Sequence, residues 1–277
     1  MSEPIEPQIK QSPRRKRFAR IPMRYVLPNL VTLLGLALGL TSIRFSIEGR
    51  YELAVIAIAA AGVLDGLDGR LARALDGQSR FGAELDSLAD FIDFGVAPAM
   101  LLYLWSLQEI KNAGWFACMV YVIACALRLA RFNVMIDDPN KPKWMGRFFT
   151  GMPSPAGAIV VLLPIYLHLS VLQIPQNTAT VPIIIAYVLL VAFLMVSRIP
   201  HFSGKEMGRV PREYFLAVML AVVALILLLA SYPAEVLVLL TLLYLGLIPL
   251  AWRRFQAYQA ADDRAAAAVE RPSPGQT

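Results

Sequence analysis

Long apolar runs occupy most of this 277-residue chain, and they limit its possible folds more than any other feature. A helix needs about 20 mostly apolar residues to cross a bilayer. Several stretches come close to that length, so the sequence predicts an all-α integral membrane protein, a bundle of about eight transmembrane helices. The expected spans are residues 25–47, 51–74, 83–107, 113–136, 152–171, 180–198, 213–231 and 233–254. Because only 17% of residues are charged, an ordinary soluble domain is excluded.

The basic residues predict the orientation of this bundle. Lys and Arg accumulate in the short cytoplasmic loops of membrane proteins. If the amino terminus is cytoplasmic, only Arg44, Arg50 and Lys111 of the 26 basic residues fall in outer loops. The sequence therefore predicts an even number of spans, with both termini in the cytoplasm. Since basic residues that flank spans account for the net charge of +6, we expect no nucleic-acid partner.

The two ends of the chain differ from the apolar middle. Residues 1–20 form a basic, proline-containing tail, and residues 256–277 are rich in Ala, Pro and charge. We expect both tails to be cytoplasmic and at least partly disordered. Residues 21–255 then form one membrane domain. The start does not resemble a cleavable signal peptide, which fits a bacterial inner membrane with the functional site on the cytoplasmic side.

Carboxylates inside two neighbouring spans form the candidate site. Asp65 and Asp68 lie about 60° apart on one face of the second expected span, and Asp86 and Asp90 lie one turn apart on the third. Ionisable residues within spans are costly and indicate function. Because a short loop joins the two helices, all four carboxylates can meet at one point. Hard oxygen ligands suit magnesium or manganese, and a pair of such ions commonly binds phosphate groups.

Small residues accompany these carboxylates. Gly69 and Ala72 share the face of Asp65 and Asp68, and Gly82 lies one turn before Asp86. They leave room for a phosphate-bearing substrate near the backbone, and Arg73 can neutralise a phosphate oxygen. Two acidic residues nearby, Asp76 and Glu84, are explained equally well as solvated interface residues. Asp93 lies one turn beyond Asp90, and its role stays open.

The same residues resemble the signature of the CDP-alcohol phosphatidyltransferase family, Asp-x2-Asp-Gly-x2-Ala-Arg followed by Gly-x3-Asp-x3-Asp. Every specified position matches, at Asp65, Asp68, Gly69, Ala72, Arg73, Gly82, Asp86 and Asp90. The resemblance implies a homodimer, a pair of divalent ions and a cytidine diphosphate substrate. It further implies metal ligands at Asp65, Asp68, Asp86 and Asp90, a general base at Asp90, and contacts to the CDP moiety from Gly69, Ala72, Arg73 and Gly82.

Other segments are similar to those of family members that use L-serine as the acceptor. They are residues 79–90, 94–99, 128–133, 151–155 and 202–205. This resemblance implies transfer of a phosphatidyl group from CDP-diacylglycerol to the serine hydroxyl, with release of CMP. Arg128 and Arg131, with Asn133, are candidates to bind the serine carboxylate, although contact with lipid phosphates explains the arginines about as well. Asp93, where many of these proteins have Ser or Asn, is a further acceptor-binding candidate.

Other functions stay open at this point. The nearest alternative keeps the chemistry and changes the acceptor to glycerol 3-phosphate, inositol or choline. A metal or proton transporter would carry carboxylates at several depths and an internal repeat, whereas these carboxylates concentrate on one hairpin. A noncatalytic scaffold gives no reason for paired aspartates. No nucleophile arrangement is evident, since Cys118 and Cys125 are expected in the core and His201 in a loop.

Overall fold

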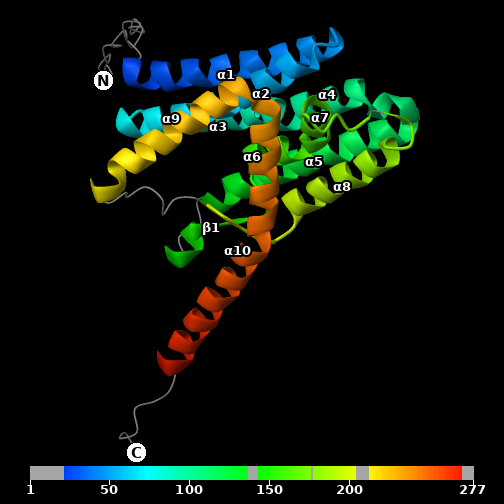
Figure 1. Ribbon diagram of the computed structural model, residues 1–277. Helices are drawn as coiled ribbons and strands as arrows, with labels where there is room; N and C mark the ends of the chain where they lie inside the picture. The colour runs from blue at the N-terminus through cyan, green and yellow to red at the C-terminus, as the bar shows by residue number, and fades with distance from the viewer. Residues whose placement is uncertain (1–21, 137–142, 176, 204–211, 270–277) are drawn as a thin grey trace, which may run out of the picture.

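The computed structural model describes residues 22–136, 143–175, 177–203 and 212–269, and helices dominate it (Figure 1). The α-helices are α1 (Met23–Ile47), α2 (Tyr51–Ala74), α3 (Arg80–Asp90), α4 (Ala97–Trp105), α5 (Lys111–Ile136), α6 (Ser154–Val161), α7 (Leu163–Leu169), α8 (Val181–Val196), α9 (Phe215–Ser231) and α10 (Pro233–Val269). Shorter turns are η1 (Phe91–Val96), η2 (Leu107–Ile110), η3 (Lys143–Arg147) and η5 (Arg212–Tyr214). Helices thus lie at every expected stretch.

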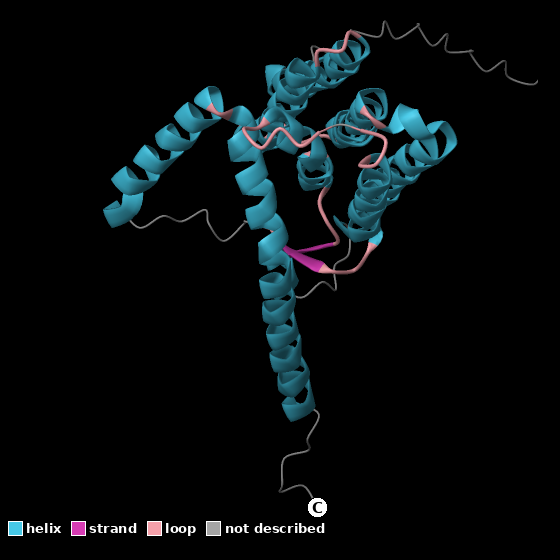
Figure 2. Ribbon diagram, turned by 45° about the vertical axis from the view of Figure 1, so that its right-hand side comes forward, coloured by secondary structure: helices cyan, strands magenta, loops and turns pink. Residues whose placement is uncertain are grey.

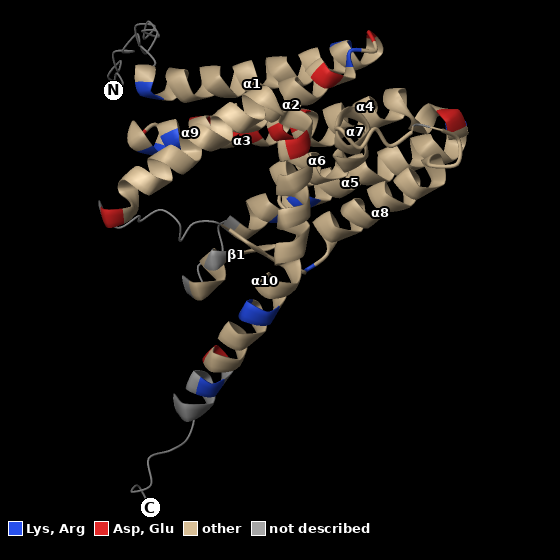
Figure 3. Cartoon of the chain, viewed as in Figure 1, with Lys and Arg blue, Asp and Glu red and all other residues tan. Residues whose placement is uncertain are grey.

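The described residues include 4 helical stretches that are long and apolar enough to cross a membrane. These are Met23–Ile47, Arg80–Trp105, Leu107–Met135 and Pro233–Asp262, and α8 and α9 are shorter apolar helices. Figure 3 shows few charged residues along α8 and α9, whereas the lower part of α10 carries several. The chain is therefore an integral membrane protein. The count of eight spans and the cytoplasmic termini stay predictions.

Two of the expected spans differ from single straight membrane helices. The stretch expected at 152–171 is divided at Leu162 into α6 and α7, and Pro164 lies in the first turn of α7. Proline lacks the amide hydrogen that would continue the upstream helix. The last helix instead runs past residue 255 to Val269, so the disordered tail expected from 256 is wrong for that part. Its Ala-rich sequence has a high helix propensity, which explains the extension. The tails at 1–20 and 270–277 lie outside the described residues.

A short antiparallel ribbon corrects the all-α prediction. Strands β1 (Phe148–Thr150) and β2 (Pro200–Phe202) pair with Phe149 opposite His201, and the ribbon meets α10 (Figure 2). His201, expected in a loop, lies in this ribbon and is only 2% exposed. The ribbon joins the chain entering α6 to the chain leaving α8, two segments about fifty residues apart in sequence.

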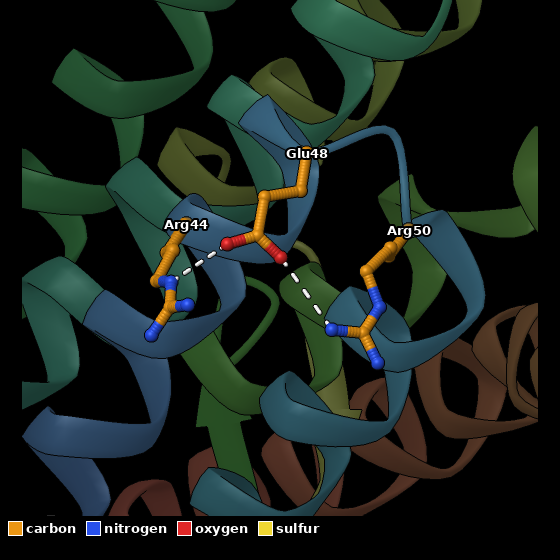
Figure 4. A network of polar contacts seen from close by, with 3 residues as sticks. All are labelled: Arg44, Glu48 and Arg50. Atoms are coloured by element: carbon orange, nitrogen blue, oxygen red, sulfur yellow. Dashed lines mark hydrogen bonds and ion pairs between the residues drawn. The ribbon is translucent and has the colours of Figure 1, made fainter.

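Helices α1 and α2 pack along their lengths as a hairpin at the top of Figure 1. An exposed ion-pair cluster lies at its turn, where Glu48 accepts a hydrogen bond from Arg44 at 2.7 Å and a longer one from Arg50 at 3.5 Å (Figure 4). The Arg44 hydrogen bond is the main reason that the pKa of Glu48 is lowered. Because the cluster is exposed, it contributes little to stability and serves mainly to order the turn.

The third helical stretch contains a π-turn, η1, between α3 and α4. A π-turn holds an extra residue and leaves a backbone carbonyl in need of a donor. The Tyr121 hydroxyl of α5 donates to the Phe94 carbonyl at 2.8 Å. A Cβ at Gly95 would lie 3.2 Å from the Cys125 Sγ, so glycine permits close packing of η1 on α5. Cys118 and Cys125 are both buried in the apolar core, as predicted.

We expect Tyr121→Phe to destabilise the protein by about 1 kcal/mol, because the Phe94 carbonyl would lose its donor inside the core. Thermal unfolding of the protein in detergent measures the change. Tyr214→Phe, at a position 60% exposed, serves as the matched control and should leave the midpoint unchanged. Equal midpoints for both variants would contradict a structural role for the hydrogen bond.

Candidate active site

The first carboxylate pair lies near the end of α2, facing α1. Asp68 is 5% exposed, and its Oδ2 accepts a hydrogen bond of 2.5 Å from Thr32 Oγ1. A distance this short is typical of a hydroxyl that donates to a charged carboxylate. Asp65, one turn earlier on the same face, is half-buried. Thr32 therefore fixes the orientation of Asp68 relative to its neighbour.

The second pair lies on α3, which begins after a short loop. Ser79 caps this helix by accepting a hydrogen bond from the Gly82 amide at 3.0 Å, and so sets where the helix begins. Asp86 then faces α2. Among the described residues, one carboxylate oxygen from each of Asp65, Asp68 and Asp86 lies within 4.8 Å of the others. The structure thus brings together three of the four predicted metal ligands, from two helices.

Asp90 and Asp93 lie where α3 passes into η1. The Asp90 carboxyl is near those of Asp65 and Asp86, but it is not part of the close group of three. Asp93 is 3% exposed, and its carboxylate packs against α1, where a Cβ at Gly39 would collide with it. Its Oδ1 has no hydrogen-bond partner among the described residues. Glycine at position 39 is what admits a carboxyl group between these helices.

The residues predicted to contact CDP lie on α2 and α3, near the loop that joins these two helices. The Arg73 guanidinium lies over Gly69, since a Cβ built on that glycine would be 3.6 Å from Arg73 Nη1. A Cβ at Gly82 would lie 2.9 Å from Asn29 Oδ1, which is too close for a side chain. Ala72 is half-buried and Arg73 is exposed. Arg73 therefore supplies a positive charge beside Gly69, as a phosphate-bearing substrate requires, whereas the space next to Gly82 is occupied by Asn29.

The two arginines of α5 lie on the other side of the carboxylates. Arg128 is 7% exposed, and its Nε donates to the Met152 carbonyl at 3.1 Å. It is close enough to interact electrostatically with Asp65 and Asp90. Arg131 Nη1 donates to the Ser197 carbonyl at 3.2 Å. Both arginines line a cavity of about 60 Å³, which we call the arginine cavity; its other lining residues are Phe132, Met135, Gly146, Phe148, Phe149 and Thr150.

Asn133 joins α5 to the helix that carries the second carboxylate pair. Its Nδ2 donates to Ser87 Oγ at 3.0 Å, and Ser87 directly follows Asp86. The structure thus brings Asn133 to the edge of the carboxylate group. All acceptor-binding candidates except Asp93, which packs on α1, lie between α5, α3 and the ribbon.

The donor set fits a divalent cation. Three carboxylates within a few ångströms repel one another strongly unless a cation compensates their charge, especially where apolar helices keep water away. Carboxylate oxygens alone, without His or Cys, favour magnesium or manganese over zinc. Thr32 supplies the outer hydrogen bond that orients a ligating carboxylate, a feature common to metal centres.

Sequence reasoning did not identify Thr32 or Asn29 as site residues. Both lie on α1, at positions three residues apart, and therefore on one helix face. The signal was present as two polar residues in an apolar span. It was weak because a threonine in a membrane helix commonly bonds to its own backbone, as Thr32 also does with the Pro28 carbonyl at 3.2 Å.

Comparison with known families identifies the class of protein that this fold and site define. Residues 25–195 match the model of the CDP-alcohol phosphatidyltransferase family, and that range contains α1 to α8 with the carboxylates, the glycines and both arginines. The chain belongs to this family. Its members use a divalent metal, which agrees with the carboxylate group of α2 and α3.

Individual relatives of this chain carry more specific names than the family does. The chain is 42% identical to a CDP-diacylglycerol--serine O-phosphatidyltransferase of Mycobacterium leprae over 240 residues, covering 86% of this chain and 78% of that protein. It is 36% identical to the protein of the same name from Helicobacter pylori, covering 66% of this chain and 74% of the relative. An archaetidylserine synthase of Methanothermobacter thermautotrophicus is 36% identical over 138 residues, 49% of this chain and 55% of the relative.

Thr32→Val should weaken the binding of a divalent metal by about tenfold, because Asp68 would lose the hydrogen bond that orients it. Titration of the purified protein with Mn²⁺, followed by electron paramagnetic resonance, measures this affinity. Thr41→Val is the matched control on the same helix, since among the described residues Thr41 donates to the Ala37 carbonyl of its own helix and to no carboxylate. If both variants bind Mn²⁺ like the unchanged protein, Thr32 does not act on the metal site.

Proposed function

We propose that this chain transfers the phosphatidyl group of CDP-diacylglycerol to the hydroxyl of L-serine and releases CMP. The observation that carries the proposal is the close group of Asp65, Asp68 and Asp86, which lies within the family domain and fits divalent metal. The names of relatives that align over most of this chain support serine as the acceptor. The archaeal relative supports it as well, because its name also gives a seryl lipid as the product.

We assign four aspartates to the metal centre: Asp65, Asp68, Asp86 and Asp90. Two ions held there, magnesium or manganese, would neutralise the diphosphate of the substrate. Asp90 accepts the proton of the serine hydroxyl, which is a general base role. The serine oxygen then forms a bond to the phosphorus that carries diacylglycerol, while the bond from this phosphorus to the CMP oxygen breaks. Direct displacement of this kind needs no side-chain nucleophile.

The nucleotide side of the substrate is assigned to the surface of α2 and α3 beside the carboxylates. The small residues Gly69 and Ala72 would let the CDP moiety approach the α2 backbone, and Gly82, which faces Asn29, is assigned to the same subsite because the resemblance to the family implies it. Arg73 compensates phosphate charge from its position over Gly69. We place the scissile phosphorus between this surface and Asp90, on the next helix.

The acceptor is assigned to the side of α5. Arg128 and Arg131 bind the serine carboxylate in the arginine cavity, whose volume of about 60 Å³ suits a small acceptor group. Asn133 supplies an amide at the edge of the site through its contact with Ser87. Asp93 is assigned to the acceptor from the α1 side, where its carboxylate, near Asp65 and Asp90, adds negative charge that attracts the serine ammonium group.

The membrane context is part of the proposal. We infer eight spans with both termini in the cytoplasm, and a site that opens to the cytoplasmic side of a bacterial inner membrane. The distribution of basic residues supports this orientation. Residues 21–255 would form the catalytic membrane domain, and the protein would act as a homodimer, as the resemblance to the family implies.

The decisive experiment measures CMP release by the purified protein in detergent, with CDP-diacylglycerol and Mg²⁺ or Mn²⁺. L-serine is compared with glycerol 3-phosphate, inositol and choline. We expect release that depends on serine and is abolished by EDTA. Release with a different alcohol would replace serine as the acceptor, and no release with any of them would refute the proposal.

Asp90→Asn should lower kcat by a factor of about 10² to 10⁴, because the variant cannot accept the serine proton. Asp76→Asn is the matched control, since Asp76 is exposed and lies outside the carboxylate group. It should retain the rate of the unchanged protein. A similar loss in both variants, or no loss in either, would remove Asp90 from the role of general base.

Arg131→Met should raise the KM for serine by about tenfold, with a smaller effect on the KM for CDP-diacylglycerol, because the carboxylate would lose a charged partner. Steady-state kinetics with each substrate varied in turn separate the two constants. Arg198→Met, at an exposed position two residues after the end of α8, is the control. An equal rise in both KM values would assign Arg131 to the fold instead of the acceptor.

A further inference from the structure

The residues that enclose the arginine cavity come from two parts of the chain. Its floor is formed by Arg128 and Arg131 of α5, within the range that matches the family model. Its opposite wall is formed by Gly146 and by Phe148, Phe149 and Thr150 of β1. The position of β1 depends on β2 and α10, and both of these lie after residue 195, where the family match ends. Elements outside the common domain therefore shape a cavity inside it.

The wall residue Phe149 lies close to Arg128. The Arg128 guanidinium carbon is 6.0 Å from the Phe149 ring centroid and 5.2 Å from that of Phe132. Cation–π contacts at these distances restrict how a guanidinium can turn. The Nε of Arg128 is also bound to the Met152 carbonyl, so two sides of the group are fixed. A shift of Phe149 would therefore change the orientation of Arg128.

Phe149 is in turn paired with His201 across the ribbon. Directly opposed residues of an antiparallel pair point to the same face. His201 Nδ1 lies 2.9 Å from the Tyr244 hydroxyl of α10, and the two rings stack with centroids 5.7 Å apart. Burial, and to a lesser extent Arg128, lower the pKa of His201 to about 4. The imidazole is therefore neutral at physiological pH, so it adds no second positive charge to that of Arg128, which is close enough to interact with it electrostatically.

The ribbon also contacts α10 through a second group of aromatic residues. Phe148 of β1 packs edge-on against Phe255 of α10 at 5.5 Å, and Trp144 stacks on Tyr258 at 6.2 Å. Phe255 and Tyr258 lie three to four turns beyond Tyr244, in the extended part of α10. Helix α10 thus contacts the ribbon and the adjoining η3 at two levels, one of which includes the hydrogen bond between His201 and Tyr244.

We propose that His201 and Tyr244 are positioning residues that set the width of the arginine cavity and thereby select a small anionic acceptor. The inference rests on the proposed function, since it assigns the acceptor to that cavity. The two residues act through Phe149 and Arg128. They do not act through the carboxylates of α2 and α3, so they should affect the acceptor more than CDP-diacylglycerol.

The principal test is Tyr244→Phe, which removes the hydroxyl and keeps the ring. We expect the KM for L-serine to rise about tenfold, while kcat and the KM for CDP-diacylglycerol stay within about twofold, as for the loss of one buried hydrogen bond. The preference for L-serine over glycerol 3-phosphate, as a ratio of kcat/KM values, should fall. Tyr232→Phe, 58% exposed next to the start of α10, is the matched control and should change neither constant.

A pair of substitutions at His201 separates its polar role from its packing. His201→Asn keeps a polar atom near the position of Nδ1 that can bond to Tyr244, whereas His201→Leu keeps bulk without that atom. We expect the asparagine variant to retain more of the serine affinity than the leucine variant. Thermal unfolding in detergent is measured for each protein alongside the kinetics.

The outcomes distinguish this inference from the proposed function. If the unchanged protein releases no CMP with serine, the proposed function is wrong and the inference about its acceptor falls with it. If the unchanged protein is active but Tyr244→Phe leaves the serine KM unaltered, only the inference is wrong. Parallel loss of kcat, both affinities and thermal stability would also overturn it, because it would show a purely structural contact.

Discussion

Mutual repulsion among buried carboxylates is the constraint on which the rest of this structure depends. Asp65, Asp68 and Asp86 approach within 4.8 Å of one another between helices that are otherwise apolar. A cation bound between them would relieve this repulsion, and metal binding would then also stabilise the helix packing of this region. A functional site of this kind accounts for ionisable residues that a bilayer otherwise disfavours.

Helix α1 contributes no carboxylate, yet much of the site depends on it. Thr32 orients Asp68, Asn29 packs on Gly82, and Gly39 makes room for Asp93. The hairpin with α2 holds these contacts in register. The arginines are fixed in a comparable way from the opposite side, by the Met152 and Ser197 carbonyls. The carboxylates and the two arginines are therefore supported by different helices.

Much of this could be predicted from the sequence, for physical reasons. Long apolar runs can only be helices in a membrane, so each expected stretch was found as helix, and face-matching aspartates gave the carboxylate group. Three-residue strands have no usable periodicity, so β1 and β2 were missed, and His201 with them. The break at Leu162 and the extension of α10 depended on single prolines and on alanine content, which hydropathy alone does not weigh. The roles of individual site residues stay predictions.

The π-turn after Asp90 has a consequence for how the chain tolerates change. An additional residue in one turn shifts the angular phase of everything that follows. The π-turn therefore changes which residues of α4 face the core, relative to the face of α3 that carries the carboxylates. The two helices nevertheless follow one another without a loop. A regular α-helix over residues 80–105 would present a different set of apolar side chains to the core for the same placement of Asp86 and Asp90.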